Sequence, residues 1–260
     1  MPKAKPAIFD KLSPEERYAK AQSKLQLLSD RVQEATSACA MVEQFAYSKD
    51  VVSRIPRSPH ARGYSVLKSM LFQHGTLKVA ALMDKPSIDR VSLPTVELLL
   101  NTPEVLKLVF TQVRSWREDG GEIMDNPETE PETYAYVKAW VEEQGRVEAD
   151  KDEAGARKEM PKLLADAAEL STCDELKAVR HARDHYIAHN LTAPGADQPP
   201  EPKMRYGHET TLLKRISPVV QGLLLFSTGH NSNLSREHAS TAQHLAKKFW
   251  SNVEFKGPDS

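Results

Sequence analysis

The segment from Arg180 to Asn190, RHARDHYIAHN, combines side chains that can bind anions with side chains that can carry protons. It holds two arginines, one aspartate and three histidines. If this segment and the residues before it form one helix, four apolar side chains lie on one stripe of that helix: Leu176, Val179, Tyr186 and Ile187. Arg183 falls in the middle of that stripe. Because a guanidinium cannot shed its proton to escape burial, Arg183 needs an anion, a partner chain or a ligand.

Arg183 and His189 together could form a minimal site for cleaving RNA. The planar fork of an arginine holds a phosphate, and a histidine with its ordinary pKa of about 6.5 suits proton transfer at neutral pH. The histidine would handle the proton of the 2′-hydroxyl or of the leaving oxygen, while the arginine would stabilise the charged phosphorane. This chemistry requires no metal ion.

Neighbouring residues are candidates for supporting that pair. Arg180 and His185 form a second, overlapping pair with similar spacing. Asn190 either hydrogen-bonds a phosphate or caps the end of the helix. Tyr186 is expected to pack in the core with its hydroxyl at the rim.

Other interpretations of the same side chains remain open. His181, His185 and His189 are spaced four apart, as in helices that offer two histidines to zinc, although three in line span too far for one tetrahedral site. Arg183 could form a buried ion pair with Asp84, which ends the apolar stripe of an upstream helix. His189 could interact with the dipole at the C-terminal end of its own helix.

The run from Arg183 to His189, RDHYIAH, resembles the signature of HEPN proteins, which is an arginine, a polar residue and, several positions later, a histidine. Asp184 supplies the polar residue. The order R-D-x-x-I-A-H is most similar to the bacterial abortive-infection, AbiU-like branch. The upstream segment VAALMDKPSIDRVSLPTVELLL also resembles that branch, whose members have a similar Leu-x-Asp helix end followed by a Ser-rich turn and a helix. The likeness covers the region from Ser13 to Trp250.

This resemblance implies an all-α, HEPN-like antiparallel helical bundle that forms a homodimer, with two copies of the motif facing each other across a cleft. It implies a metal-independent endoribonuclease without a cofactor, which cuts single-stranded or looped RNA in phage defence or as part of a toxin–antitoxin pair. Arg183 and His189 would be its catalytic residues, and an antitoxin protein would be a further partner. Since some HEPN proteins bind without cutting, a non-catalytic binding or dimerisation module is the alternative. A helical metal-binding protein that uses the histidine row is the third hypothesis.

Helix signals recur along the chain that must position this motif, whereas strand signals are nearly absent. Ser13 and Glu16 form a predicted capping box that opens a helix reaching about Ser48. A second helix is predicted over 59–84, and two shorter helices follow it, the second of which begins after Thr102. Another helix is predicted over 133–148, and the motif helix is predicted to run from a capping box at Thr172–Glu175 to Asn190. The last two helices are predicted over 208–227 and 235–252. The predicted core includes apolar side chains at helical spacing: Leu67, Met70, Leu71, Leu77, Ala81, Val105, Leu108, Val109, Val113, Trp116, Trp140 and Trp250.

A single domain is predicted over residues 1–260, with residues 118–159 as an insertion. The stretch Glu118–Glu132 has seven acidic residues and no basic one, which is typical of an exposed loop. One helix follows it, and residues 149–159 are predicted to form a polar hinge. Residues 192–207 are rich in proline and are predicted to be a second loop.

Composition limits the remaining functions. The chain has 260 residues, of which 40% are hydrophobic and 27% charged, and its net charge of -1 means that any contact with nucleic acid must be local. Cys39 and Cys173 are the only cysteines, so neither a disulfide framework nor a zinc knuckle is indicated. There is no glycine-rich nucleotide loop and no Gly-x-Ser-x-Gly elbow. Without an apolar run suited to a signal peptide or a membrane span, we expect a cytoplasmic protein with no membrane partner.

Overall fold

The computed structural model describes residues 9–55, 61–118, 131–184, 204–205, 207–234 and 236–255. Within these ranges all regular structure is helical, which confirms the predicted all-α class. None of the helices in this part of the chain is both long and apolar enough to cross a membrane.

The elements follow in this order: the 3₁₀ turn η1 (Phe9–Lys11), α1 (Pro14–Tyr47), α2 (Lys49–Ser53), α3 (Ala61–Leu82), α4 (Leu93–Leu100), α5 (Pro103–Glu118), α6 (Pro131–Leu170), α7 (Asp174–His181), α8 (His208–Thr228) and α9 (Glu237–Ser251). The bounds of α1, α3, α8 and α9 agree with the predicted ranges to within a few residues.

The long helix α1 begins at the predicted capping box. The hydroxyl of Ser13 accepts a hydrogen bond from the backbone N–H of Glu16 at 3.2 Å, and the Glu16 carboxylate accepts one from the backbone N–H of Ser13 at 2.8 Å. Several of its buried residues recur at intervals of three, four and seven positions: Ala21, Leu25, Leu28, Val32, Ala35 and Cys39. Each buried leucine contributes about 1.5–3 kcal/mol of hydrophobic free energy, so this face anchors the bundle.

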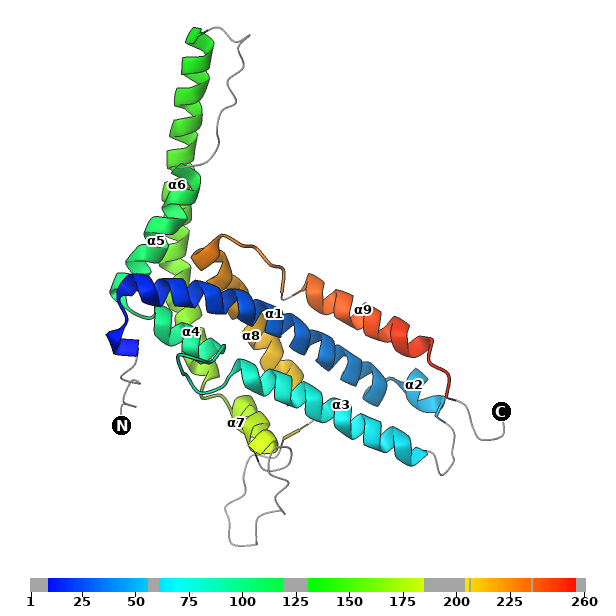
Figure 1. Cartoon of the computed structure of the whole chain (residues 1–260). Coiled ribbons are helices and arrows are strands. Elements are labelled where there is room, and N and C mark those ends of the chain that lie inside the picture. The colour runs from blue at the N-terminus through cyan, green and yellow to red at the C-terminus, as the bar shows by residue number, and fades with distance from the viewer. Residues whose placement is uncertain are drawn as a thin grey trace.

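α1 runs through the middle of the bundle, with α3 and α9 on either side of it (Figure 1). α8 packs against α1 as well, while α4 and α5 contact it toward its N-terminal end. α5 pairs with α6, and α6 packs on α8. The short helix α7 lies between α8 and the end of α3, so the motif helix is held against two elements of the bundle.

α6 differs from its prediction, because it is one helix of 40 residues rather than a helix ending near residue 148. The polar hinge expected at residues 149–159 is therefore wrong. Ala149 and Ala156 are fully buried in that stretch, and so is Met160 directly after it. Its acidic residues pair with α5, where Arg114 Nη1 lies 2.6 Å from the Asp150 carboxylate and Arg117 Nε lies 2.9 Å from that of Asp152. The polar residues thus join two helices instead of breaking one. The N-terminal part of α6 extends beyond the rest of the bundle (Figure 1).

Two other core predictions are also corrected. Leu67, Met70 and Leu77 of α3 are exposed, and the residues of α3 that are buried are Gly75, Thr76, Val79, Ala80 and Leu82. Trp140 is 57% exposed on the projecting part of α6. Trp116 packs against the core and Trp250 is buried, as predicted.

Candidate functional site

α7 presents the described part of the motif at its C-terminal end. Its first turn differs from the prediction, because Cys173 is the N-cap and makes no side-chain capping bond, so the capping box expected at Thr172–Glu175 is wrong. Leu176 and Val179 are buried, as the predicted stripe requires. Residues 182–184 continue from α7 in a wider π-helical turn, a rare backbone form that is frequent at functional sites.

Arg183 lies where this stripe meets two carboxylates. Its Nη1 donates to Oδ1 of Asp84 at 2.7 Å, and its Nε donates to Oδ1 of Asp184 at 2.7 Å. The hydrogen bond to Asp184 raises the pKa of Arg183, burial opposes this, and the hydrogen bond to Asp84 raises the pKa further. The pair with Asp84 confirms that interpretation of Arg183. The guanidinium keeps its charge, so it can still bind a phosphate.

Arg180 ties α7 to the end of α3. Its Nη2 donates a hydrogen bond to the backbone carbonyl of Met83. Burial lowers the pKa of Arg180, and the neighbouring charge of Arg183 lowers it further. Arg180 therefore holds the chain that carries Asp84 in place beside the motif.

The loop over residues 83–92, between α3 and α4, is fixed by its own hydrogen bonds. The backbone N–H of Ser87 donates to Oγ1 of Thr95 at 3.3 Å, and the Ser92 hydroxyl bonds to the same oxygen at 2.9 Å. The backbone N–H of Arg90 donates to the carbonyl of Ser87 at 3.0 Å. Ser92 and Thr95 are fully buried, so the loop is anchored in the core.

α1 holds the same loop from its other side. Lys24 Nζ donates to the carbonyl oxygen of Arg90 at 3.0 Å, and Arg31 Nη1 donates to that of Val91 at 3.0 Å. The side chain of Arg90 reaches back toward the motif, where its Nη1 lies 4.0 Å from Oδ1 of Asp84. The structure therefore places Arg90 beside Arg183. No motif or spacing singles out Arg90, although it stands only six positions after Asp84.

The remaining predicted site residues lie outside the described part of the chain: His185, Tyr186, His189 and Asn190. Their roles stay predictions, and so does the histidine row as a metal site, because His181 is its only described member. Among the described residues, no group of three or more His, Cys, Asp or Glu side chains could hold a metal ion. The predicted loop over 192–207 also lies outside the described residues, apart from positions 204, 205 and 207.

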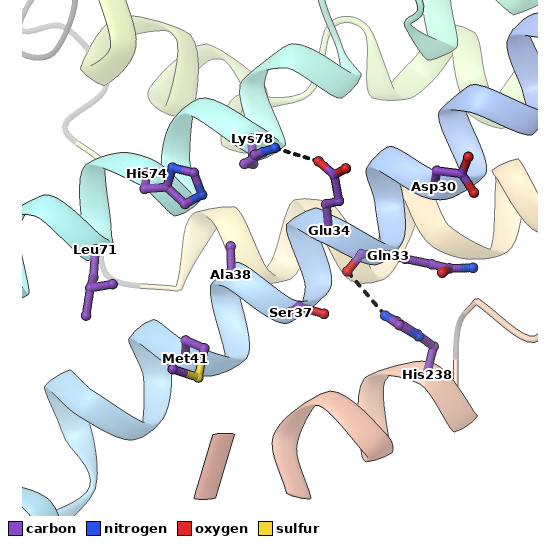
Figure 2. A pocket seen from close by; sticks show the side chains of 10 residues that line it. All are labelled: Asp30, Gln33, Glu34, Ser37, Ala38, Met41, Leu71, His74, Lys78 and His238. Atoms are coloured by element: carbon purple, nitrogen blue, oxygen red, sulfur yellow. Dashed lines mark hydrogen bonds and ion pairs between the residues drawn. The ribbon is translucent and has the colours of Figure 1, made fainter. Parts of the chain in front are cut away.

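A separate pocket of about 750 Å³ lies between α1, α3 and α9 and contains no motif residue (Figure 2). Lys78 Nζ and the Glu34 carboxylate form an ion pair at 2.5 Å on one side of it. On the other side, Nε2 of His238 lies 3.2 Å from the carbonyl oxygen of Gln33. Lys78, Glu34 and His238 thus already have protein partners, and this arrangement does not point to a particular chemistry.

Comparison with known proteins extends the resemblance from the motif to most of the bundle. The family model described as AbiU2, a HEPN family, matches residues 25–245, which include α3, the loop over 83–92 and α7. No curated protein and no solved structure matches the chain.

Proposed function

Because the chain belongs to the AbiU2 family of HEPN proteins, we propose that it is a metal-independent endoribonuclease whose site forms across a homodimer. Arg183 and His189 are its catalytic residues in this proposal. Its substrate is single-stranded or looped RNA, and its role is in phage defence or in a toxin–antitoxin pair that includes an antitoxin protein.

The observation that carries this proposal is the position of Arg183. An arginine is costly at the edge of a core, and here two carboxylates fix its guanidinium at the end of the motif helix. Asp84 comes from a loop that is anchored independently, so the orientation of Arg183 does not depend on substrate. A charged donor held in place before the reaction is what stabilisation of a phosphorane requires.

The proposed reaction is an attack of the RNA 2′-hydroxyl on the adjacent phosphorus. One His189 removes the proton of the 2′-hydroxyl as the O2′–P bond forms, and His189 of the partner subunit donates a proton to the O5′ atom as the P–O5′ bond breaks. Arg183 stabilises the negative charge of the phosphorane. The products are a 2′,3′-cyclic phosphate and a 5′-hydroxyl. A single copy of the motif supplies only one histidine of this kind, so a symmetric dimer completes the site.

Purified protein incubated with total RNA and EDTA tests the proposal. Wild-type protein is expected to cut RNA, to leave cyclic phosphate ends and to spare DNA, which lacks the 2′-hydroxyl. His189→Ala should slow cleavage by roughly 10²- to 10⁴-fold while costing about 1 kcal/mol of stability or less. Arg183→Ala should be equally inactive but less stable. Arg146→Ala, at an exposed position of α6, is the matched control and should cut at the wild-type rate.

One observation favours the alternative, a non-catalytic binding or dimerisation module. Both Nε and Nη1 of Arg183 already donate to carboxylates, which would suffice to hold the helix without any substrate. Wild-type protein that forms a dimer but leaves RNA intact in every condition would establish this alternative. Cleavage abolished by EDTA and restored by zinc would instead support the metal-binding hypothesis.

A further inference from the structure

We propose that the bound RNA strand extends from Arg183 over Arg90 and then along α1. On α1, its phosphates contact Lys20, Lys24 and Arg31. We call Arg90 and these three residues of α1 the basic path. This inference rests on the proposed function, because it takes RNA as the ligand, but it concerns binding and can be tested without cleavage.

The first step of the path is the shared carboxylate of Asp84. Its Oδ1 atom accepts from Arg183 at 2.7 Å and lies 4.0 Å from Nη1 of Arg90. One carboxylate therefore stands between two guanidiniums, and Asp184 is the second carboxylate beside Arg183. Arg180 lies in electrostatic reach of the same groups, so three guanidiniums face two carboxylates and one positive charge is in excess. The side chain of Arg90 is 52% exposed, so it can turn its remaining donors toward a second phosphate next to the one at Arg183.

The second step is the fixed position of the Arg90 backbone. Its N–H donates to Ser87 and its carbonyl accepts from Lys24, each at 3.0 Å. The adjacent carbonyl of Val91 accepts from Arg31 at 3.0 Å. A binding side chain on a fixed backbone loses less conformational freedom when its ligand arrives. The same hydrogen bonds connect the loop to Lys24 and Arg31 of α1, so the basic residues of the loop and of α1 lie next to each other.

The third step is the spacing of the cations on α1. Lys20, Lys24 and Arg31 stand four and seven positions apart, which places them on one face of the helix. The pKa of Lys24 is lowered by burial first and by the charge of Lys20 next, whereas Asp89 opposes the shift and Arg31 adds to it. The cations are thus close enough to repel one another, and a phosphate would relieve that repulsion.

Local charge favours a polyanion here although the whole chain is slightly acidic. Arg183 and the basic path supply five cations, and four carboxylates are in contact or in electrostatic reach of them: Asp84, Asp89, Asp184 and Glu34. Glu34 is itself paired with Lys78. The net charge of the chain is -1, so this local excess of positive charge is not a property of the surface at large.

Binding of a non-cleavable RNA at increasing salt tests the path. The probe is a fluorescein-labelled 2′-O-methyl RNA of roughly 12 nucleotides, which no 2′-hydroxyl attack can cut. Arg90→Ala and Lys20→Ala should each weaken its binding several-fold and reduce the slope of log Kd against log salt by about 0.7, the value for one lost phosphate contact on a single strand. Arg146→Ala, which removes a similarly exposed arginine on the projecting part of α6, should bind as wild type does. Lys24 and Arg31 are left intact because they also hold the loop.

The outcomes separate this inference from the proposed function. Unchanged affinity and unchanged salt slope in both variants would overturn the path, while cleavage by the wild type would still support the enzyme. Wild-type protein that binds the probe through the path but cuts no RNA would support the path and reject the enzyme. Failure of the wild-type protein to bind the probe at low salt would overturn the path as well. In an active enzyme, Arg90→Ala should raise KM for a long RNA and leave kcat unchanged.

Discussion

Asp84 and Arg183 lie 99 positions apart in the chain, and their side chains meet at 2.7 Å. Asp84 follows the end of α3, and Arg183 lies in the turn that continues α7. The two segments that resemble the AbiU-like branch therefore meet at this ion pair, because one contains the helix end Leu-Met-Asp and the other begins with Arg-Asp. Both side chains are about three-quarters buried, at 29% and 24% exposed, so the pair joins the two segments where water screens it only partly.

Asp84→Asn should impair both stability and RNA cleavage. The substitution removes one charge from a partly buried pair and leaves Arg183, within the described part of the chain, with only its neighbour in sequence, Asp184, as an ionic partner at 2.7 Å. We expect this to lower the free energy of unfolding by about 1–2 kcal/mol, which urea unfolding measures. Cleavage should fall because Arg183 loses its orientation. Asp184→Asn is the control for stability, since that carboxylate is 51% exposed and its loss should cost less. Full activity in Asp84→Asn would show that Asp84 does not position Arg183 for catalysis.

Trp250→Ala and Trp140→Ala should have very different effects on stability. Trp250 is 6% exposed, its Nε1 donates to the carbonyl of Met41 at 3.2 Å, and its ring lies 4.4 Å from that of Phe45. Its truncation should cost about 3–5 kcal/mol, whereas truncation of the exposed Trp140 should change stability by about 0.5 kcal/mol or less. Thermal unfolding of both variants measures this difference. A large loss in Trp140→Ala would mean that its surface is covered in solution.

Glu209 should make the protein less stable as the pH rises. It is buried, and among the described residues its Oε2 atom has no hydrogen-bond partner. Burial raises the pKa of Glu209 above its usual 4.5, so the folded state holds the proton more tightly than the unfolded state does. The contribution of Glu209 is present below the unfolded pKa and is lost as the pH rises through the folded pKa.

The variant Glu209→Gln, which cannot ionise, isolates this contribution. Urea unfolding from about pH 5 to about pH 8 should show wild-type stability declining relative to that of the variant. Parallel stability curves for the two proteins would mean that the carboxylate has the same pKa in the folded and unfolded states.

The predicted acidic loop Glu118–Glu132 begins with the last residue of α5 and ends in the first turn of α6, and its remaining residues, 119–130, lie outside the described part of the chain. The segment over residues 119–130 should be dispensable for folding. It has many acidic residues and helix breakers and few apolar residues to bury. A Gly/Ser linker of the same length between α5 and α6 should leave the helical circular dichroism and the melting temperature nearly unchanged. A collapse of stability would show that this segment packs against the bundle.

Some helix signals with a local cause were predicted well from the sequence, although the capping box expected at Thr172–Glu175 was not. The capping box at Ser13 and the apolar spacing of Val105, Val109 and Val113 depend only on nearby residues, and both are present. The false hinge at residues 149–159 had the opposite cause. Its inner face is made largely of alanines, which give a weak hydrophobic signal, and its charges are paired with α5, which a single segment of sequence does not reveal.

One partner of Arg183 in the candidate site was predictable from the sequence, and one neighbouring residue was not. Asp84 could be named as a partner of Arg183 because Arg183 interrupts one apolar stripe and Asp84 ends another, and a charge there needs an opposite charge. Arg90 could not be named, because it reaches the site through a loop whose shape depends on hydrogen bonds from Thr95 and from α1. No spacing in the sequence encodes that geometry.

Because α6 is one continuous helix, the helix geometry sets the rotation of its outer turns about the helix axis relative to the motif. From Pro131 to Leu170 it spans roughly 60 Å at about 1.5 Å per residue, and α7 begins four positions later. Its inner part packs against the bundle through buried residues, and its outer turns continue the same helix. Inserting one residue near position 148 would rotate everything before it by about 100° and advance it by about 1.5 Å. A molecule that binds the outer turns of α6 therefore lies at an angle and a distance from the motif that the helix geometry sets.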